Sequence, residues 1–162
     1  QEGEGGIADA LSLAEPFVGD DKMCVILGDN IIEKNIKEQA DKFREQKSGA
    51  KIILKEVTDP ERFGVPIFNQ NKIIRIEEKP EKPKSNYAVT GIYFYDQEVF
   101  PFIKRLKPSE RGELEISDVN NMYIEKENLT WDMLQGWWTD AGTFESLLYA
   151  NNLVAKNGAN HI

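Results

Sequence analysis

Two aspartates of this chain stand where sheet proteins bind ligands. Asp29 lies in Gly28-Asp29-Asn30, directly after the apolar run 23–27, and Asp140 lies between two tryptophans and a predicted helix start. In open α/β sheets ligands bind outside the carboxyl ends of strands, where a carboxylate can hold Mg²⁺ against a phosphate. A simple turn at Asp29 and a charge near a helix N-terminus at Asp140 are the ordinary interpretations. Together the two aspartates form a better candidate metal pair than either alone.

Charged and glycine-rich segments add further candidates. In 77–80 (EEKP), after a predicted strand, a carboxylate could accept hydrogen bonds from sugar hydroxyls and a lysine could neutralise a phosphate; a solvated charge run is the alternative. Gly64 could let backbone approach a ligand, or simply begin a strand. Gly3, Gly5 and Gly6 precede a predicted helix whose N–H groups could bind an anion, although they also fit a loose terminus.

Composition limits the function classes. The chain has 162 residues, with 40% hydrophobic and 30% charged, which fits one soluble globular domain with a real core. The net charge of −8 disfavours nucleic acid and anionic membranes as partners. The single Cys excludes a Cys-rich zinc site, and the single His, His161, disfavours a His-dependent triad. Phosphoryl or nucleotidyl transfer between phosphates fits better, because it needs no protein base.

The elements that must position these residues alternate between helix and strand. Hydrophobic spacing predicts strands over 23–27, 50–57, 63–68, 72–77, 87–95 and 129–134, and helices over 7–18, 34–47, 96–106, 113–126 and 143–156. The run 23–27 is wholly apolar, which is typical of a strand buried on both faces. We therefore expect residues 1–162 to form one α/β domain, with a mixed, mostly parallel sheet flanked by helices.

Seven blocks together resemble the sugar-1-phosphate nucleotidyltransferases, most closely the branch that uses dTTP and glucose 1-phosphate. They are Gln1 with 5–8 (GGIA), 25–30 (VILGDN), 59–65 (DPERFGV), 77–80 (EEKP), 83–93 (PKSNYAVTGIY), 111–116 (RGELEI) and 138–143 (WTDAGT). Each block is weak alone, but they run in family order across nearly the whole chain. The resemblance implies the nucleotide-diphospho-sugar transferase fold, incomplete at the N-terminus.

The resemblance also implies roles for individual residues. Asp29 and Asp140 match the carboxylates that hold the catalytic Mg²⁺. The other implied positions are Gln1 and Gly6 for the pyrimidine base, Gly64, Glu78, Val89 and Gly91 for the glucose, and Lys79 and Arg111 as catalytic cations near the sugar phosphate. Phe63 stands where many family members have Tyr, so a hydroxyl contact is missing there.

The implied reaction is attack of glucose 1-phosphate on the α-phosphorus of dTTP, giving dTDP-glucose and pyrophosphate with Mg²⁺ as cofactor. That product feeds dTDP-rhamnose and other deoxysugars of surface polysaccharides. The expected location is the cytoplasm, because no signal peptide opens the chain. Two alternatives stay open: a UTP-using nucleotidyltransferase, and a non-catalytic module that binds a sugar phosphate or nucleotide.

The sequence also departs from the family. A Gly-rich loop with Arg and Lys cradles the triphosphate in the family, and nothing of the form GGxGxRLxP occurs in this chain, which begins at Gln1 without Met. We therefore expect a C-terminal portion of the enzyme that is inactive alone. Its expected macromolecular partners are an N-terminal half or further copies of itself.

Overall fold

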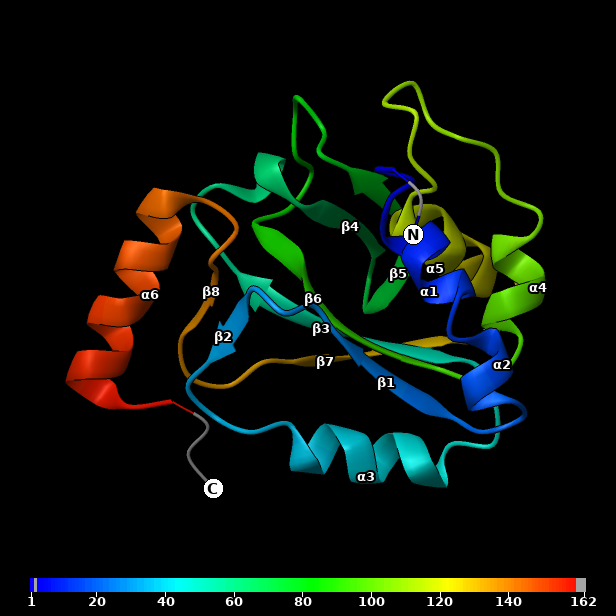
Figure 1. Ribbon diagram of the computed structural model, residues 1–162, viewed down its shortest axis with the longest axis horizontal. Coiled ribbons are helices and arrows are strands. Elements are labelled where there is room, and N and C mark those ends of the chain that lie inside the picture. The colour runs from blue at the N-terminus through cyan, green and yellow to red at the C-terminus, as the bar shows by residue number, and fades with distance from the viewer. Residues whose placement is uncertain (2, 160–162) are drawn as a thin grey trace.

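A mixed six-stranded sheet forms the centre of the computed structural model, which describes residues 1 and 3–159 (Figure 1). Its strands are β1 (Met23–Ile26), β3 (Ala50–Glu56), β4 (Gly64–Asn69), β5 (Lys72–Glu78), β6 (Tyr87–Tyr95) and β7 (Leu129–Met133). A separate pair, β2 (Asn30–Ile32) and β8 (Trp138–Asp140), lies beside it. His161 lies outside the described residues.

The sheet is mixed, as expected, and the α/β class is confirmed. Its strand order is β5-β4-β6-β3-β7, and β1 also pairs with β6. Among the described strands, β3 and β7 pair parallel and the other pairings are antiparallel, so parallel pairing has a smaller share here than the sequence predicts. The hairpin of β4 and β5 reverses the chain direction before β6, which makes β6 antiparallel to β3.

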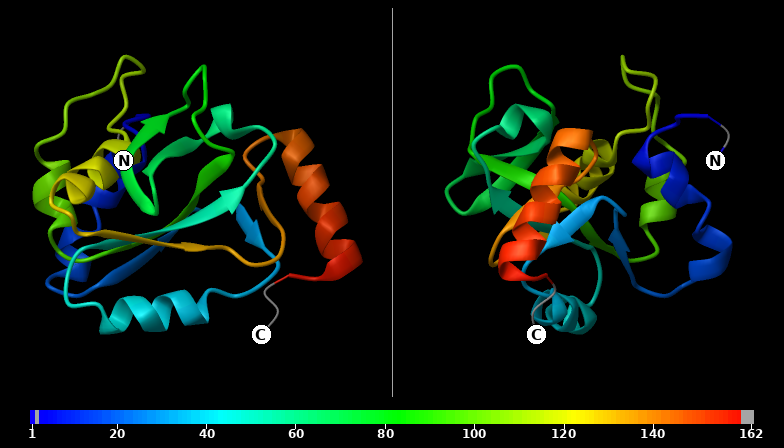
Figure 2. Two further views of the ribbon diagram at one scale, coloured as in Figure 1. Left: turned by 180° about the vertical axis from the view of Figure 1, so that it is seen from behind. Right: turned by 60° about the vertical axis from the view of Figure 1, so that its left-hand side comes forward.

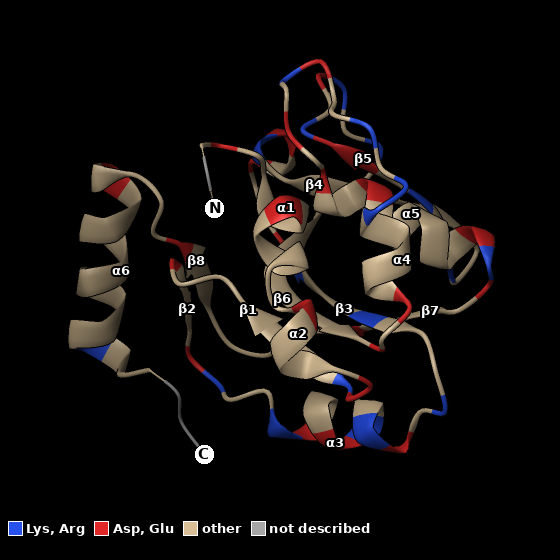
Figure 3. Ribbon diagram, turned by 45° about the vertical axis from the view of Figure 1, so that its right-hand side comes forward, with Lys and Arg blue, Asp and Glu red and all other residues tan. Residues whose placement is uncertain are grey.

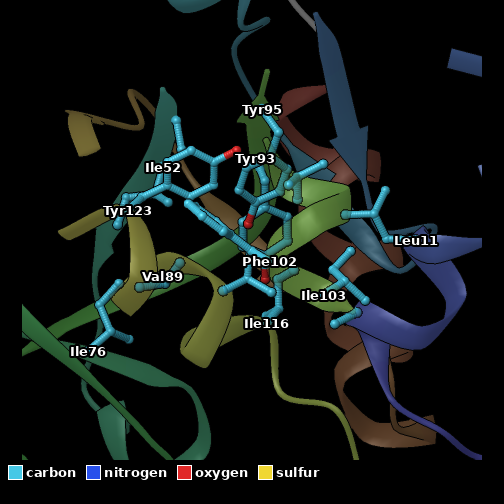
Figure 4. Close-up of a cluster of buried hydrophobic side chains, with 14 of the residues drawn as sticks. Leu11, Ile52, Ile76, Val89, Tyr93, Tyr95, Phe102, Ile103, Ile116 and Tyr123 are labelled. Carbon is cyan, nitrogen blue, oxygen red and sulfur yellow. The ribbon is translucent and has the colours of Figure 1, made fainter. Parts of the chain in front are cut away.

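Strand β6 is buried on both faces, and its side chains alternate between two hydrophobic clusters. Val89, Tyr93 and Tyr95 join the larger cluster, whereas Ile92 and Phe94 point into the smaller one. This alternation follows from the twofold side-chain period of a strand. Figure 4 shows the larger cluster, where these residues meet side chains of α1, α4 and α5.

Helices cover both faces of the sheet. They are α1 (Ile7–Ser12), α2 (Glu15–Val18), α3 (Lys37–Glu45), the 3-10 turn η1 (Pro60–Arg62), α4 (Val99–Ile103), α5 (Ile116–Glu125) and α6 (Phe144–Asn157). Helices α1, α4 and α5 pack on the larger cluster, and α3 packs on the smaller one on the opposite face (Figure 1). Helix–sheet–helix layering of this kind buries both faces of the central strands.

Side-chain hydrogen bonds fix the start of α6 and the end of α3. Thr143 caps α6 through a capping box with Ser146, as its position before the helix predicts. Lys22 donates to the carbonyls of Phe43 and Arg44 (3.2 and 3.0 Å) at the end of α3. The helix dipole stabilises a positive charge at this end of a helix. The predicted helix over 7–18 is interrupted, and α1 and α2 are separate short helices.

Strand β1 differs from its sequence-based expectation. Its residues alternate between half-buried and exposed, and the side chain of Ile26 is 52% exposed. The prediction of burial on both faces is therefore wrong for this strand, because Met23 and Val25 pack on the larger cluster while the face of Cys24 and Ile26 is exposed. Cys24, also on β1, is exposed as well.

Helix α6 stands at one side of the molecule next to β8 (Figures 1 and 2). Figure 3 shows it almost free of charge. Several of its large apolar side chains are exposed, including Phe144, Leu148 and Tyr149. Over the described residues, no helix has the length and apolar character needed to cross a membrane.

We predict that Tyr95→Phe destabilises the fold. The Tyr95 hydroxyl donates to Oδ1 of Asn120 (2.7 Å), and both residues are fully buried. Removing the hydroxyl leaves Oδ1 of Asn120 without its hydrogen-bond donor in the core. The free energy of unfolding should therefore fall by about 1–3 kcal/mol, and the melting temperature by about 2–4 °C for each kcal/mol lost. Thermal melts measure this. The matched control is Tyr95→Phe with Asn120→Leu, which should recover part of the loss; equal or greater loss in the double variant would contradict the prediction.

Candidate functional site

The site forms where β6 exchanges one neighbouring strand for another. Along the edge of β6 that faces away from β3, β6 pairs with β4 at Val89 and with β1 from Ile92 to Tyr95. Between these points the carbonyl of Gly91 accepts a hydrogen bond from the N–H of Leu27 (2.9 Å). The two neighbours diverge at Gly91, so the sheet forks there and leaves room for a ligand.

Strand register brings three of the predicted sugar-binding residues side by side. Gly64 on β4 is paired with Glu78 on β5 and with Val89 on β6. These residues come from segments separated by 14 and 11 positions in the sequence, yet they form one row across the sheet. Gly91 lies two residues along β6 from Val89, and therefore faces the same side.

The two predicted metal carboxylates meet through the β2–β8 pair. Asn30 pairs with Asp140, and the N–H of Ala141 donates to the carbonyl of Asp29 (2.8 Å). A Cβ added at Gly142 would lie 2.8 Å from Oδ1 of Asp140 and 3.3 Å from Oδ2 of Asp29. Both carboxylates therefore line one small space that a side chain would fill.

This donor set suits a hard cation that keeps part of its shell for other ligands. Among the described residues no group of three or more His, Cys, Asp and Glu side chains is arranged to hold a metal. Two carboxylates with open positions are typical of Mg²⁺ sites, in which water and substrate phosphate complete the coordination. Asp29 and Asp140 fit Mg²⁺ in this sense.

A cavity of about 210 Å³ collects most of the predicted residues. Its walls include Asp29, Gly64, Glu78, Lys79, Val89, Gly91, Arg111 and Asp140. Further lining residues that site prediction omitted include Asn30, Tyr93, Glu113, Glu115, Ser117 and Trp138. The cavity thus combines carboxylates, three cations (Arg62, Lys79 and Arg111) and an aromatic wall.

Glu78 is held by the start of α5. The hydroxyl of Ser117, itself buried, donates to Oε2 of Glu78. Burial raises the pKa of the Glu78 carboxyl, and the nearby Glu115 adds to this, while the Ser117 hydrogen bond and the charges of Lys79 and Arg111 oppose it. A partly buried carboxylate held in one orientation is a strong acceptor for the hydroxyl groups of a ligand.

Arg111 lies among carboxylates at the mouth of the cavity. It pairs with Glu113 (2.7 Å), with Glu115 (3.4 Å) and, more distantly, with Glu78 (3.9 Å). Lys79 is exposed and has the left-handed backbone conformation at φ 42°. Such a φ is uncommon for a residue with a side chain and is found at functional sites. The two cations can each meet an anion that enters the cavity.

The two predicted base-binding residues lie outside this cavity. Gln1 and Gly6 line a neighbouring apolar groove between α1, α2 and β1. The Gln1 amide donates to Oδ2 of Asp9 (2.9 Å) and to the carbonyl of Gly6 (3.2 Å). The groove and the cavity share Ile7, Leu27 and Glu113 as lining residues, so the groove adjoins the cavity.

Sequence signals could have identified some of the omitted residues. Tyr93 shares the face of Val89 and Gly91 on β6, as the twofold period requires. Burial raises its pKa, reinforced by the charges of Glu78 and Asp29, so its phenol stays neutral. Ser117 gives no comparable signal, because its role depends on how α5 packs against β5.

Comparisons with known proteins agree with this geometry. The nucleotidyl transferase family pattern matches residues 1–157. The glucose-1-phosphate thymidylyltransferase of Neisseria meningitidis is 47% identical over 153 residues, covering 92% of this chain and 53% of the relative. The enzyme of the same name from Xanthomonas campestris is 44% identical, with 92% of this chain and 52% of the relative covered. The chain thus spans about half the length of these curated relatives.

Solved structures show the same fold. A Bacillus anthracis protein described as a glucose-1-phosphate thymidylyltransferase, in complex with sucrose, superposes with a TM-score of 0.89 at 59% identity, covering 94% of this chain and 62% of that one. A UDP-glucose pyrophosphorylase with UDP-glucose has a TM-score of 0.86 at 23% identity over 96% of this chain and 64% of that one, a likeness that concerns the fold alone. The fork at Gly91 and its charged cavity agree with these likenesses, and the family match over residues 1–157 shows that this chain belongs to the nucleotidyl transferase family.

Proposed function

We propose that this chain provides the sugar-phosphate and metal-binding part of an enzyme that transfers a thymidylyl group from dTTP to glucose 1-phosphate, giving dTDP-glucose and pyrophosphate. The observation that carries the proposal is the gathering of Asp29, Asp140, Glu78, Lys79 and Arg111 around one cavity. Because the substrates are phosphorylated metabolites, the proposed place of action is the cytoplasm.

The proposed reaction needs no base from the protein. A phosphate oxygen of glucose 1-phosphate forms a bond to the α-phosphorus of dTTP, and the bond from that phosphorus to the oxygen that bridges the α- and β-phosphates breaks. The electron pair leaves with pyrophosphate, and the attacking oxygen is already ionised at neutral pH. Catalysis therefore consists of positioning and charge neutralisation.

The residues of the cavity divide this work. Glu78 orients the sugar hydroxyls beside the row of Gly64 and Val89, while Lys79 and Arg111 neutralise the sugar phosphate. Asp29 and Asp140 hold Mg²⁺, which when bound neutralises charge developing on the phosphates. Gln1 and Gly6, in the adjoining groove, are the proposed contacts of the thymine base.

Preference for dTTP rests on similarity to the Neisseria and Xanthomonas relatives, which are named thymidylyltransferases. A UTP-using enzyme is the alternative within the same chemistry. Turnover of dTTP and UTP by the protein that carries this segment separates the two, and faster use of UTP would replace the proposed nucleotide.

A binding module without catalysis is the second candidate, favoured by the exposed side chains of β1. Ile26 and Cys24 on this strand are exposed beside the apolar groove, and exposed apolar surface of this kind marks sites of association. Under this candidate the chain binds a sugar phosphate and pairs with another polypeptide.

We predict that Asp29→Asn and Asp140→Asn each abolish divalent-cation binding. Either change removes one of the two negative charges that face Gly142. In the wild-type chain, Mn²⁺ should broaden the amide signals of residues 29–30 and 140–142 in NMR spectra. Broadening should disappear in both variants and persist in the control Asp21→Asn, which lies in an exposed turn. Unchanged broadening in either site variant would contradict the metal assignment.

We expect the 162-residue chain alone to show little or no turnover, because it has no Gly-rich loop with Arg and Lys to neutralise the triphosphate. Release of pyrophosphate from dTTP and glucose 1-phosphate with Mg²⁺ measures this. Robust release by the isolated chain would refute this expectation.

We predict opposite effects of Glu78→Gln on stability and binding. Burial raises the pKa of Glu78, so the folded state holds its proton more tightly than the unfolded state and loses stability as pH rises through that raised pKa. The variant should melt above the wild type at pH 8, with the difference vanishing near pH 4. It should also bind glucose 1-phosphate about tenfold or more weakly.

Melting curves across pH and calorimetric titration check these effects. The matched control is Glu77→Gln on the same strand, whose side chain pairs with Lys84 instead. It should leave the affinity for glucose 1-phosphate unchanged. A Glu78→Gln variant with wild-type affinity would count against the sugar-binding role.

A further inference from the structure

One amide group connects the carboxylate pair, the fork in the sheet and the aromatic wall. Oδ1 of Asn30 accepts hydrogen bonds from the N–H of Gly91 (2.9 Å) and from Nε1 of Trp138 (2.7 Å). Nδ2 of Asn30 donates to Oδ1 of Asp29 (2.9 Å). These bonds join β2 to β6 and β8 through a single side chain.

The network fixes which way this amide points. Both neighbours of its oxygen are N–H donors, so the oxygen must face Gly91 and Trp138, and the NH₂ group must face the Asp29 carboxylate. Asn30 also occupies the space above Gly91, where an added Cβ would overlap the amide. The close approach therefore requires glycine at 91.

Trp138 forms a wall of the cavity. Its ring packs edge-on against Phe63, with ring centroids 5.2 Å apart, and both residues line the cavity. The ring contact with Phe63 and the hydrogen bond from Nε1 to Asn30 hold the indole at two points. Together they restrict the orientation of the Trp138 side chain. The position of the aromatic wall thus depends on Asn30.

We propose that Asn30 is a positioning residue that sets the Trp138 wall for the sugar and orients the Asp29 carboxylate for the divalent cation. The inference deepens the proposed function and rests on it. Asn30 acts through Trp138 and Asp29, so its loss should weaken sugar-phosphate binding and disturb cation binding together.

The test uses the 162-residue chain and three variants. Asn30→Leu has a similar size and removes all three bonds, whereas Asn30→Asp keeps both acceptor contacts and replaces only the donor to Asp29. Trp138→Phe removes Nε1 and leaves the other two bonds of Asn30 in place. The readouts are the indole N–H signal of Trp138, assigned from its absence in Trp138→Phe, the dissociation constant of glucose 1-phosphate and line broadening by Mn²⁺.

We expect the indole N–H of Trp138 to be protected from exchange in the wild type and in Asn30→Asp, and to lose protection in Asn30→Leu. Asn30→Leu and Trp138→Phe should each weaken binding of glucose 1-phosphate about tenfold, and the double variant should be little worse than either. Mn²⁺ broadening near residue 29 should change in Asn30→Leu and persist in Trp138→Phe.

Two results would overturn the inference. One is an unchanged indole signal and affinity in Asn30→Leu; the other is additive losses in the double variant, which would show that Asn30 and Trp138 act separately. If Asn30→Leu fails to fold, Trp138→Phe decides, because unchanged affinity in that variant leaves the Nε1 bond without a role in binding.

The proposed function and this inference fail in different ways. A wild-type chain that binds neither glucose 1-phosphate nor Mn²⁺ refutes the proposed function, and the positioning role falls with it. A wild-type chain that binds both, with variants that do the same, leaves the function standing and refutes only the role of Asn30.

Discussion

The fork of the sheet at Gly91 is the constraint on which the site depends. Strand β6 is paired with β3 along one edge, while the other edge belongs to β4 near Val89 and to β1 from Ile92 onward. A continuous neighbour along that edge would close the sheet and leave no cavity. Burial of both faces of β6 makes this arrangement rigid, because shifting its register by one residue would exchange the side chains of its two faces.

The carboxylates belong to a second small sheet that must be joined to the first. Strands β2 and β8 have three residues each, which is too short to be stable alone. The amide of Asn30 joins this pair to β6 at Gly91, and the N–H of Leu27, three residues before β2, makes a second contact with the same glycine. A few polar contacts at Gly91 therefore determine how the carboxylates of Asp29 and Asp140 lie relative to the row of Gly64, Glu78 and Val89.

Local patterns predicted most of the elements, and long-range pairing determined what they missed. The aromatic and β-branched run 87–95 is β6, and the polar turn after residue 69 joins β4 to β5. Strands β2 and β8 carry no periodic signal, because three residues are too few for one. The exposure of Ile26 was equally invisible, since an apolar run does not report whether both faces of its strand are covered.

The candidate site shows the same division. Spacing and resemblance indicated the residues between Asp29 and Asp140 that line the cavity. The resemblance also indicated Gln1 and Gly6, but it did not predict that these two residues line the adjoining groove instead. The residues around them, such as Ser117 beside Glu78, depend on packing between α5 and β5. Neighbouring side chains that hold a functional group in place leave no fixed spacing in the sequence.

Under the proposed function, the charge balance of the cavity accounts for how an acidic protein can select a phosphorylated ligand. Arg111 is already paired with Glu113 and Glu115, so a phosphate that approaches alone must compete with two carboxylates and also meets the charges of Asp29 and Asp140. When a divalent cation accompanies the phosphate, the aspartate pair attracts the cation, and the repulsion between the aspartates and the phosphate is offset. Under the proposed function the acidic lining therefore disfavours bare anions and favours the metal-bound nucleotide beside the sugar phosphate, which is the pairing that the reaction requires.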